Sequence, residues 1–64
     1  MTDNRKDEYK GYDKGDKVES FVIGKIDHFY PDTRKVMWAK LELEIEGHSY
    51  FISIPADNLG MVIK

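Results

Sequence analysis

Residues 36–55, VMWAKLELEIEGHSYFISIP, decide the fold that this sequence predicts. Apolar and charged side chains alternate strictly from Ala39 to Glu46, and a period of two is typical of a strand that buries one face. The alternation resumes after Gly47, a residue that readily takes the positive φ of a tight turn. We therefore predict an antiparallel hairpin that pairs over residues 37–54 and turns at Glu46-Gly47.

The same pattern predicts which residues face each other across the hairpin. A shift of one residue would place the apolar side chains of the return strand among the glutamates, which a one-sided core does not allow. A four-residue loop keeps the same parity, so the turn type stays open. The predicted inner pairs are Ile45 with His48, Leu43 with Tyr50, Leu41 with Ile52 and Ala39 with Ile54. The predicted outer pairs are Trp38 with Pro55 and Glu42 with Phe51.

Length and composition limit what the chain can be. Its 64 residues make one domain at most, and a chain of this size buries only about 60% of its unfolded surface. It contains no cysteine, so we expect no disulfide and a reducing, cytoplasmic setting. No apolar run approaches the roughly 20 residues that span a bilayer, so no membrane is expected as a partner. Ten basic and twelve acidic residues give a net charge of −2, which does not favour a general attraction to nucleic acid.

Residues 1–16 are predicted to form a flexible charged tail, followed by a small β-barrel domain over residues 17–64. Lysine, arginine, aspartate and glutamate dominate the tail, and its hydrophobic residues are only Met1, Tyr9 and Tyr12. Such a segment buries too little surface to offset the entropy of ordering. The alternative is that Tyr9 and Tyr12 fold onto the barrel.

The other segments complete a five-stranded, all-β barrel. Residues 18–30, VESFVIGKIDHFY, are predicted as one long strand that bends at Gly24, because a glycine within a strand pattern is typical of a bulge or corner. Residues 31–35 form a turn that begins with a proline. A short helical turn over 56–59 and a last strand over 61–64 complete the chain.

The segment IPADNLGMVI, residues 54–63, resembles the end of Src-homology-three (SH-three) domains, where a one-turn helix precedes the last strand. KGDKV at 14–18 is similar to the start of an early strand in that family, and Trp38-Ala39 resembles its tryptophan on the central hairpin. The resemblance covers residues 14–63 and implies an SH-three-like barrel. The family binds proline-rich peptides in an aromatic groove. Its acidic loop and its N-terminal signature are missing here, so only the barrel topology is carried over.

An apolar group on the outer face of the hairpin is the first candidate site. Aromatic anchors ringed by charge are typical of protein interfaces, and glutamates on the same face could dock on a basic surface. We interpret this face as a docking surface for a larger protein partner; the alternative is that its apolar residues pack against the chain's own tail or last strand. The predicted partner-binding residues are Val36, Trp38, Phe51, Pro55, Glu42 and Glu44.

A second interpretation is a small barrel that binds RNA or single-stranded DNA. Such barrels combine a basic groove with aromatic side chains on which bases stack. Over residues 18–64 the basic residues number fewer than the acidic ones, which weakens this interpretation. The nucleic-acid-binding residues would be Lys25, Tyr30, Arg34, Lys35 and Lys40.

Nothing in the sequence carries recognisable chemistry. His28 and His48 fall on separate strands without cysteines, whereas a zinc site needs three or four ligands. There is no catalytic triad spacing and no glycine-rich phosphate loop. We therefore expect no enzyme, metal or cofactor, but a non-enzymatic interaction module such as a bacterial or phage accessory or inhibitor protein. It would be a monomer or a weak homodimer that pairs through edge strands.

Overall fold

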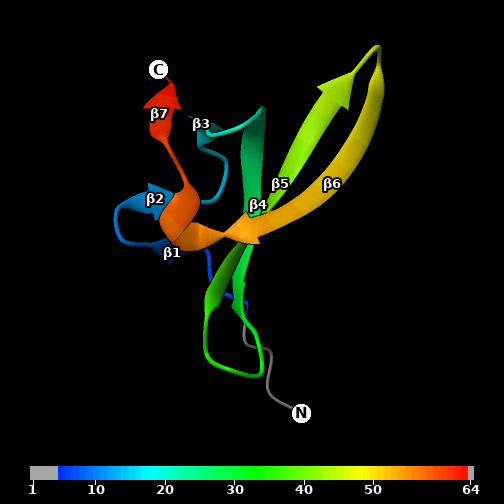
Figure 1. The fold of residues 1–64 in the computed structure, drawn as a ribbon. Helices are drawn as coiled ribbons and strands as arrows, with labels where there is room; N and C mark the ends of the chain where they lie inside the picture. The colour runs from blue at the N-terminus through cyan, green and yellow to red at the C-terminus, as the bar shows by residue number, and fades with distance from the viewer. Residues whose placement is uncertain (1–4, 64) are drawn as a thin grey trace.

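The computed structural model describes residues 5–63 and is all-β (Figure 1). One antiparallel sheet of five strands has the order β6-β5-β4-β3-β7, and β1 and β2 form a small second sheet. The elements are β1 (Glu8–Tyr9), β2 (Tyr12–Asp13), β3 (Lys17–Glu19), β4 (Ile23–Pro31), β5 (Met37–Ile45), β6 (His48–Pro55), the 3-10 turn η1 (Ala56–Asn58) and β7 (Met61–Ile63). The predicted all-β class, five-stranded sheet, helical turn and last strand are confirmed, although residue 64, the predicted end of that strand, lies outside the described residues. A closed barrel is not found, because β6 and β7 are the two edges of the sheet within residues 5–63.

The central hairpin has the predicted register at every position. Leu41 pairs with Ile52 inside, and Trp38 pairs with Pro55 outside. The turn is the two-residue form, and both of its residues have positive φ, 52° at Glu46 and 81° at Gly47. Such turns twist in the same sense as the strands they join, which explains why a glutamate accepts this conformation here.

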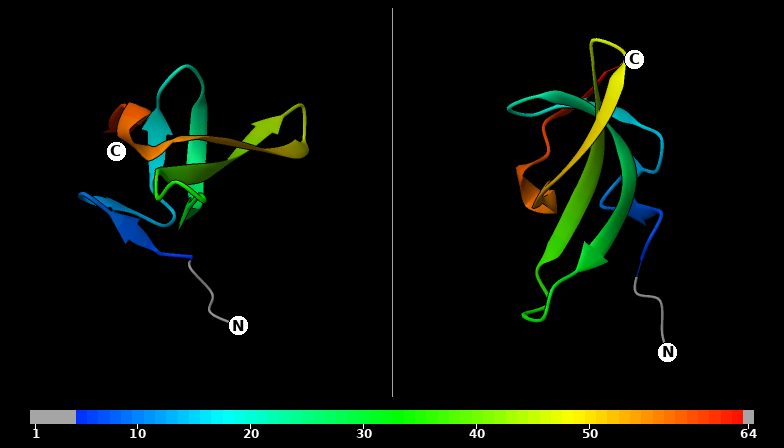
Figure 2. Two further views of the ribbon diagram at one scale, coloured as in Figure 1. Left: turned by 60° about the horizontal axis from the view of Figure 1, so that its bottom comes forward. Right: turned by 90° about the vertical axis from the view of Figure 1, so that its right-hand side faces the viewer.

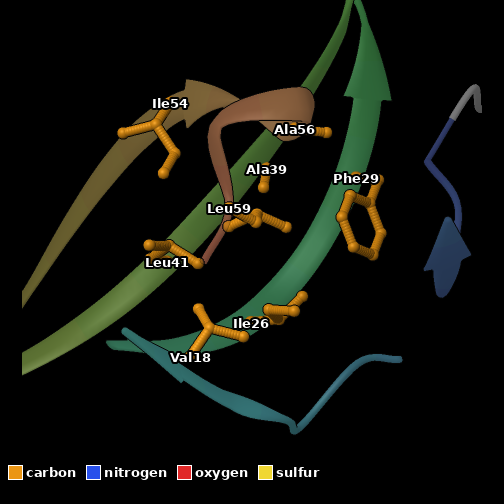
Figure 3. Close-up of a cluster of buried hydrophobic side chains, with 8 residues drawn as sticks. All are labelled: Val18, Ile26, Phe29, Ala39, Leu41, Ile54, Ala56 and Leu59. Atoms are coloured by element: carbon orange, nitrogen blue, oxygen red, sulfur yellow. The ribbon is translucent and has the colours of Figure 1, made fainter. Parts of the chain in front are cut away.

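The core lies on the inner face of the sheet, where the strands coil around η1 and the residue after it (Figure 3). Ala56 and Leu59 are buried at the end of the chain and cover side chains that come from β3, β4, β5 and β6. The core residues are Val18, Ile26, Phe29, Ala39, Leu41, Ile54, Ala56 and Leu59. A chain this short can bury few side chains, so each of them contributes a large share of the stability.

The prediction of one long strand over residues 18–30 is wrong. The segment reverses after β3 and returns as β4, and the amide of Ser20 donates to the carbonyl of Val22 at 2.9 Å within the reversal. Gly24 pairs with Val18 and is not a corner. A Cβ there would lie 2.7 Å from Cδ2 of Leu43 and 3.3 Å from the backbone oxygen of Glu42, so β4 and β5 pass close together at this position. Apolar residues on both parities suggested one bent strand, but they reflect a three-residue strand, a nine-residue strand and the 76% exposed Phe21 between them.

Residues 5–16 also differ from the predicted tail, because they pack along β4. The three residues of β3 pair with only the first part of β4, which leaves the amides and carbonyls farther along that edge without a sheet partner. The N-terminal segment supplies those partners: the amide of Gly15 donates to the carbonyl of Ile26 at 2.8 Å, and that of Lys6 donates to the carbonyl of Phe29 at 2.8 Å. Unpaired backbone groups are costly in a core-facing strand, which accounts for the ordering of a charged segment.

The two tyrosines of this segment follow the alternative that the sequence left open. The ring of Tyr9 lies 5.7 Å from that of Phe29, and the hydroxyl of Tyr12 donates to the carbonyl of Gly60 at 2.7 Å. Figure 2 shows the small β1-β2 sheet beside the main sheet. The rest of the predicted tail, residues 1–4, lies outside the described residues.

Within residues 5–63, no helical segment has the length and apolar character needed to cross a membrane.

Candidate docking face

Three neighbouring strands, β4, β5 and β6, present one surface on the side away from the core. Residues that pair directly across antiparallel strands have their side chains on the same face. The pairings therefore bring together three rows of side chains, which we call the outer face. The rows are Tyr30, Trp38 and Pro55; His28, Lys40 and Ser53; and Lys25, Glu42 and Phe51.

An aromatic row occupies one end of the outer face. Trp38 is half-buried and lies between Tyr30 and Pro55. The hydroxyl of Tyr30 donates to Oγ of Ser53 at 2.7 Å and so links β4 to β6 across the central strand. Trp38 thus has a paired neighbour on each side, and both rings keep part of their surface in solvent.

The indole of Trp38 is fixed by Asp32, which lies in the turn before β5. Indole Nε1 donates to one carboxylate oxygen of Asp32 at 3.0 Å. The other oxygen accepts from the amides of Arg34 at 2.7 Å and Val36 at 2.9 Å. These bonds, the indole bond first among them, hold the pKa of Asp32 below its ordinary value because they stabilise the charged carboxylate. One side chain therefore sets both the shape of the turn and the direction of the indole.

The opposite end of the outer face combines an exposed ring with charges of both signs. Phe51 is 51% exposed, and the ammonium of Lys40 lies 5.1 Å from its ring centroid. Lys25 pairs with Lys17 on one side and Glu42 on the other. Next to this row is a hollow of about 520 Å³, lined by Lys17, Ile23, Gly24, Lys25, Glu42, Glu44 and Ser49.

In the comparisons with family models, curated proteins and solved structures, nothing matches this chain. The SH-three-like resemblance therefore stays a prediction.

The two sets of predicted site residues lie largely on one surface. Trp38, Phe51, Pro55, Glu42, Lys25, Tyr30 and Lys40 all belong to the rows of the outer face, and Glu44 lines the hollow beside it. Val36, which is 42% exposed, lies in the turn before β5 together with exposed Arg34 and Lys35. The protein-binding and nucleic-acid-binding interpretations thus concern the same part of the molecule, which the sequence alone did not reveal.

The histidines do not come together. His48 is beside the hairpin turn, whereas His28 contacts Asp27 with Nδ1 and Oδ2 2.6 Å apart. This hydrogen bond lowers the pKa of Asp27 below its ordinary value. In the part of the chain that the structure describes, no three histidine, aspartate or glutamate side chains gather as a metal site would require.

Asp32 is the residue that the sequence interpretation missed. The turn over residues 31–35 is predicted from its proline, and the sequence interpretation gives its aspartate no role. The available signal was an aspartate directly after a proline, a position from which its side chain can accept from amides two and four residues later. The additional bond to the indole depends on how β5 leaves the turn, and no local pattern encodes that direction.

Proposed function

We propose that this protein is a non-enzymatic interaction module that binds a larger protein partner on its outer face. One observation carries the proposal: a fixed tryptophan and an exposed phenylalanine lie on the same face of the sheet, with lysine and glutamate side chains between and beside them. Interfaces owe most of their affinity to a few aromatic or arginine side chains surrounded by polar contacts. The outer face has this arrangement.

The hydrogen bonds to Asp32 support the proposal further. A side chain that must be ordered on binding reduces affinity by the entropy it loses. The indole of Trp38 is already held by a hydrogen bond of 3.0 Å, so it loses less side-chain entropy when a partner stacks on it. The neighbouring lysines and glutamates suit a partner whose own contact surface carries both signs of charge.

The arrangement of the strands supports the SH-three-like assignment, which we retain as part of the proposal. The chain forms a meander from β3 to β6, and then η1 carries it back so that β7 pairs with β3. The one-turn helix before the last strand is where the resemblance places it. We also retain the cytoplasmic setting that the composition suggested.

RNA or single-stranded DNA is the second candidate ligand, because Tyr30, Trp38 and Lys40 lie on one face. Stacking aromatics beside cations would suit single strands. However, Glu42 is paired directly with Lys25 on that face, and Glu44 lines the hollow next to it. Carboxylates at these positions repel a phosphate backbone, so the observations favour a protein.

Tyr50 and Phe51 provide a matched pair of variants for the test. Both are 51% exposed, and as successive residues of β6 they point to opposite faces. The protein is immobilised in a lysate of its host, with and without nuclease, as wild type, Phe51→Ser and Tyr50→Ser. We expect a nuclease-resistant protein that Phe51→Ser loses and Tyr50→Ser retains.

Two results would contradict this proposal. Equal capture by both variants would show that the outer face is not the docking surface. Loss of the captured material after nuclease would favour the nucleic-acid interpretation. Far-UV circular dichroism of each variant shows whether it has kept the fold.

A further inference from the structure

The two edges of the sheet are protected very differently. Natural edge strands avoid pairing with other chains by being short or by carrying charge, proline or a bulge. The edge strand β7 has only three residues. The edge strand β6 has eight, HSYFISIP, without a lysine, arginine, aspartate or glutamate. Its pairing with β5 runs without a bulge, and its only proline is its last residue.

The free side of β6 is open along its length (Figure 1). Among residues 5–63, no strand pairs with it on the side away from β5. Exposed apolar side chains lie on both faces of the strand, Tyr50 on the inner face and Phe51 on the outer face. An open edge with uncovered apolar side chains above and below is a template for another strand.

We propose that two copies of this chain pair antiparallel through β6, about a two-fold axis at Phe51. The two five-stranded sheets then form one continuous sheet. This inference does not rest on the proposed function, because it is argued from the free backbone groups of β6, although the ring of Phe51 belongs to both surfaces.

The hairpin determines which backbone groups are free to pair. In an antiparallel ladder, hydrogen-bonded and non-bonded pairs alternate, and the pair that flanks a two-residue turn is hydrogen-bonded. Counting from the pair of Ile45 and His48, the amides and carbonyls of Ser49, Phe51 and Ser53 point away from β5. They are the groups that a second copy would meet.

An axis at Phe51 gives all three of these residues a partner within the strand. Phe51 meets Phe51 of the second copy, and Ser49 meets Ser53 of the second copy. The next outward residue, Pro55, has no amide hydrogen, so the ladder ends there. Moving the axis by one residue would pair Ser53 with the turn, or Ser49 with that proline.

The side chains agree with this register. On the inner face, Tyr50 would lie opposite Ile52 of the second copy, an aromatic and β-branched pair of the kind that stabilises sheets. On the outer face, the two Phe51 rings would lie next to each other at the axis. Like charges would not oppose each other along this pairing, because β6 contains no lysine, arginine, aspartate or glutamate.

The absence of cysteine from the sequence makes a clean cross-linking test possible. In a hydrogen-bonded pair the two Cα atoms lie about 5.5 Å apart, which is within the range that a disulfide bridges. We expect purified Phe51→Cys to form a covalent dimer on mild oxidation. Ser49→Cys alone should not link, whereas a mixture of Ser49→Cys and Ser53→Cys should give the mixed dimer. Non-reducing electrophoresis and mass spectrometry read the products.

Phe51→Lys tests the same register without oxidation. Wild-type protein should sediment with twice the 7.5 kDa mass of one chain, and Phe51→Lys, which places two ammonium groups at the axis, should sediment as a single chain. A wild type that remains monomeric up to millimolar concentration would overturn the proposal. So would a Phe51→Lys dimer, or linking of Ser49→Cys alone as readily as Phe51→Cys. Because the purified chain is used alone, these results are independent of whether a partner binds the outer face.

Discussion

The two ends of the β5–β6 hairpin have the same alternating pattern but very different surroundings. At one end Leu41 and Ile54 are 0% and 5% exposed, whereas at the other Ile45 and Tyr50 are 54% and 51% exposed on the same inner face. The difference arises because β4 pairs with β5 only as far as Glu42, and η1 covers only the first end (Figure 3). Alternation therefore determines which way a side chain points, and neighbouring elements determine whether it is buried.

The largest expected effect compares these two ends directly. Leu41→Ala removes a fully buried side chain and should lower the free energy of unfolding by about 2–5 kcal/mol. Ile45→Ala, on the same strand and face, should change it by less than about 0.5 kcal/mol. Urea unfolding followed by tryptophan fluorescence measures both. Equal losses would show that Ile45 is packed as tightly as Leu41, and would contradict the contrast between the two ends of the hairpin.

Two glycines extend the comparison to close contacts. A Cβ on Gly60 would overlap the backbone carbonyl of Glu19, which is held by the pairing of β3 with β7. A Cβ on Gly24 would meet Cδ2 of Leu43 at 2.7 Å, but that methyl group is at the end of a flexible side chain beside the open end. Gly60→Ala should therefore cost about 1–3 kcal/mol, and Gly24→Ala clearly less. Thermal unfolding measures the order, and the reverse order would contradict this account.

These contrasts show what the sequence could predict. The register of β5 and β6 was predictable, because an apolar pattern with a period of two and a glycine turn allow only one parity. Which residues of the hairpin are buried was not predictable, because burial depends on where β4 ends and where η1 returns. Ile45 and Tyr50 therefore read as core residues but are exposed.

The same reasoning applies to the start of the chain and to the candidate site. Residues 5–16 have too few apolar side chains to predict order, yet they meet a strand edge that needs backbone partners. The members of the outer face were predictable from parity on β5 and β6. Lys25 and Tyr30 lie on the same face because of the register of β4. That register shifts between Ile26 and His28, and no sequence pattern indicates the shift.

A smaller effect is expected from the contacts by which the N-terminal segment packs on the main sheet. The hydroxyl of Tyr12 is part-buried and donates to the carbonyl of Gly60 at 2.7 Å, so Tyr12→Phe should cost about 0.5–1.5 kcal/mol. The hydroxyl of Tyr9 makes an exposed bond of 3.2 Å to Asp57, and Tyr9→Phe should cost less. Urea midpoints compare the two variants. No loss in Tyr12→Phe would mean that this segment does not stabilise the sheet.

The smallest effect concerns the two turns that flank β5. The turn at Glu46-Gly47 relies on its backbone conformation, whereas the turn before β5 is held by the carboxylate of Asp32. The bonds from the indole and the amides lower the pKa of Asp32 from its ordinary value of 3.8. Since the folded chain holds the charged form more tightly, this contribution to stability is complete above the ordinary pKa. It is lost as the pH falls toward the lower folded value.

Asp32→Asn separates this contribution from the acid sensitivity of the rest of the protein. The asparagine keeps an acceptor oxygen but has no charge, so the variant should be slightly less stable than wild type at neutral pH. The gap between their urea midpoints should stay constant down to about pH 5 and close below about pH 4, near the ordinary pKa of an aspartate. The lowered pKa of Asp27 acts equally in both proteins and cancels in the difference. A gap that persists unchanged at pH 3 would mean that the carboxylate charge does not stabilise the turn, and that Trp38 owes its position to packing alone.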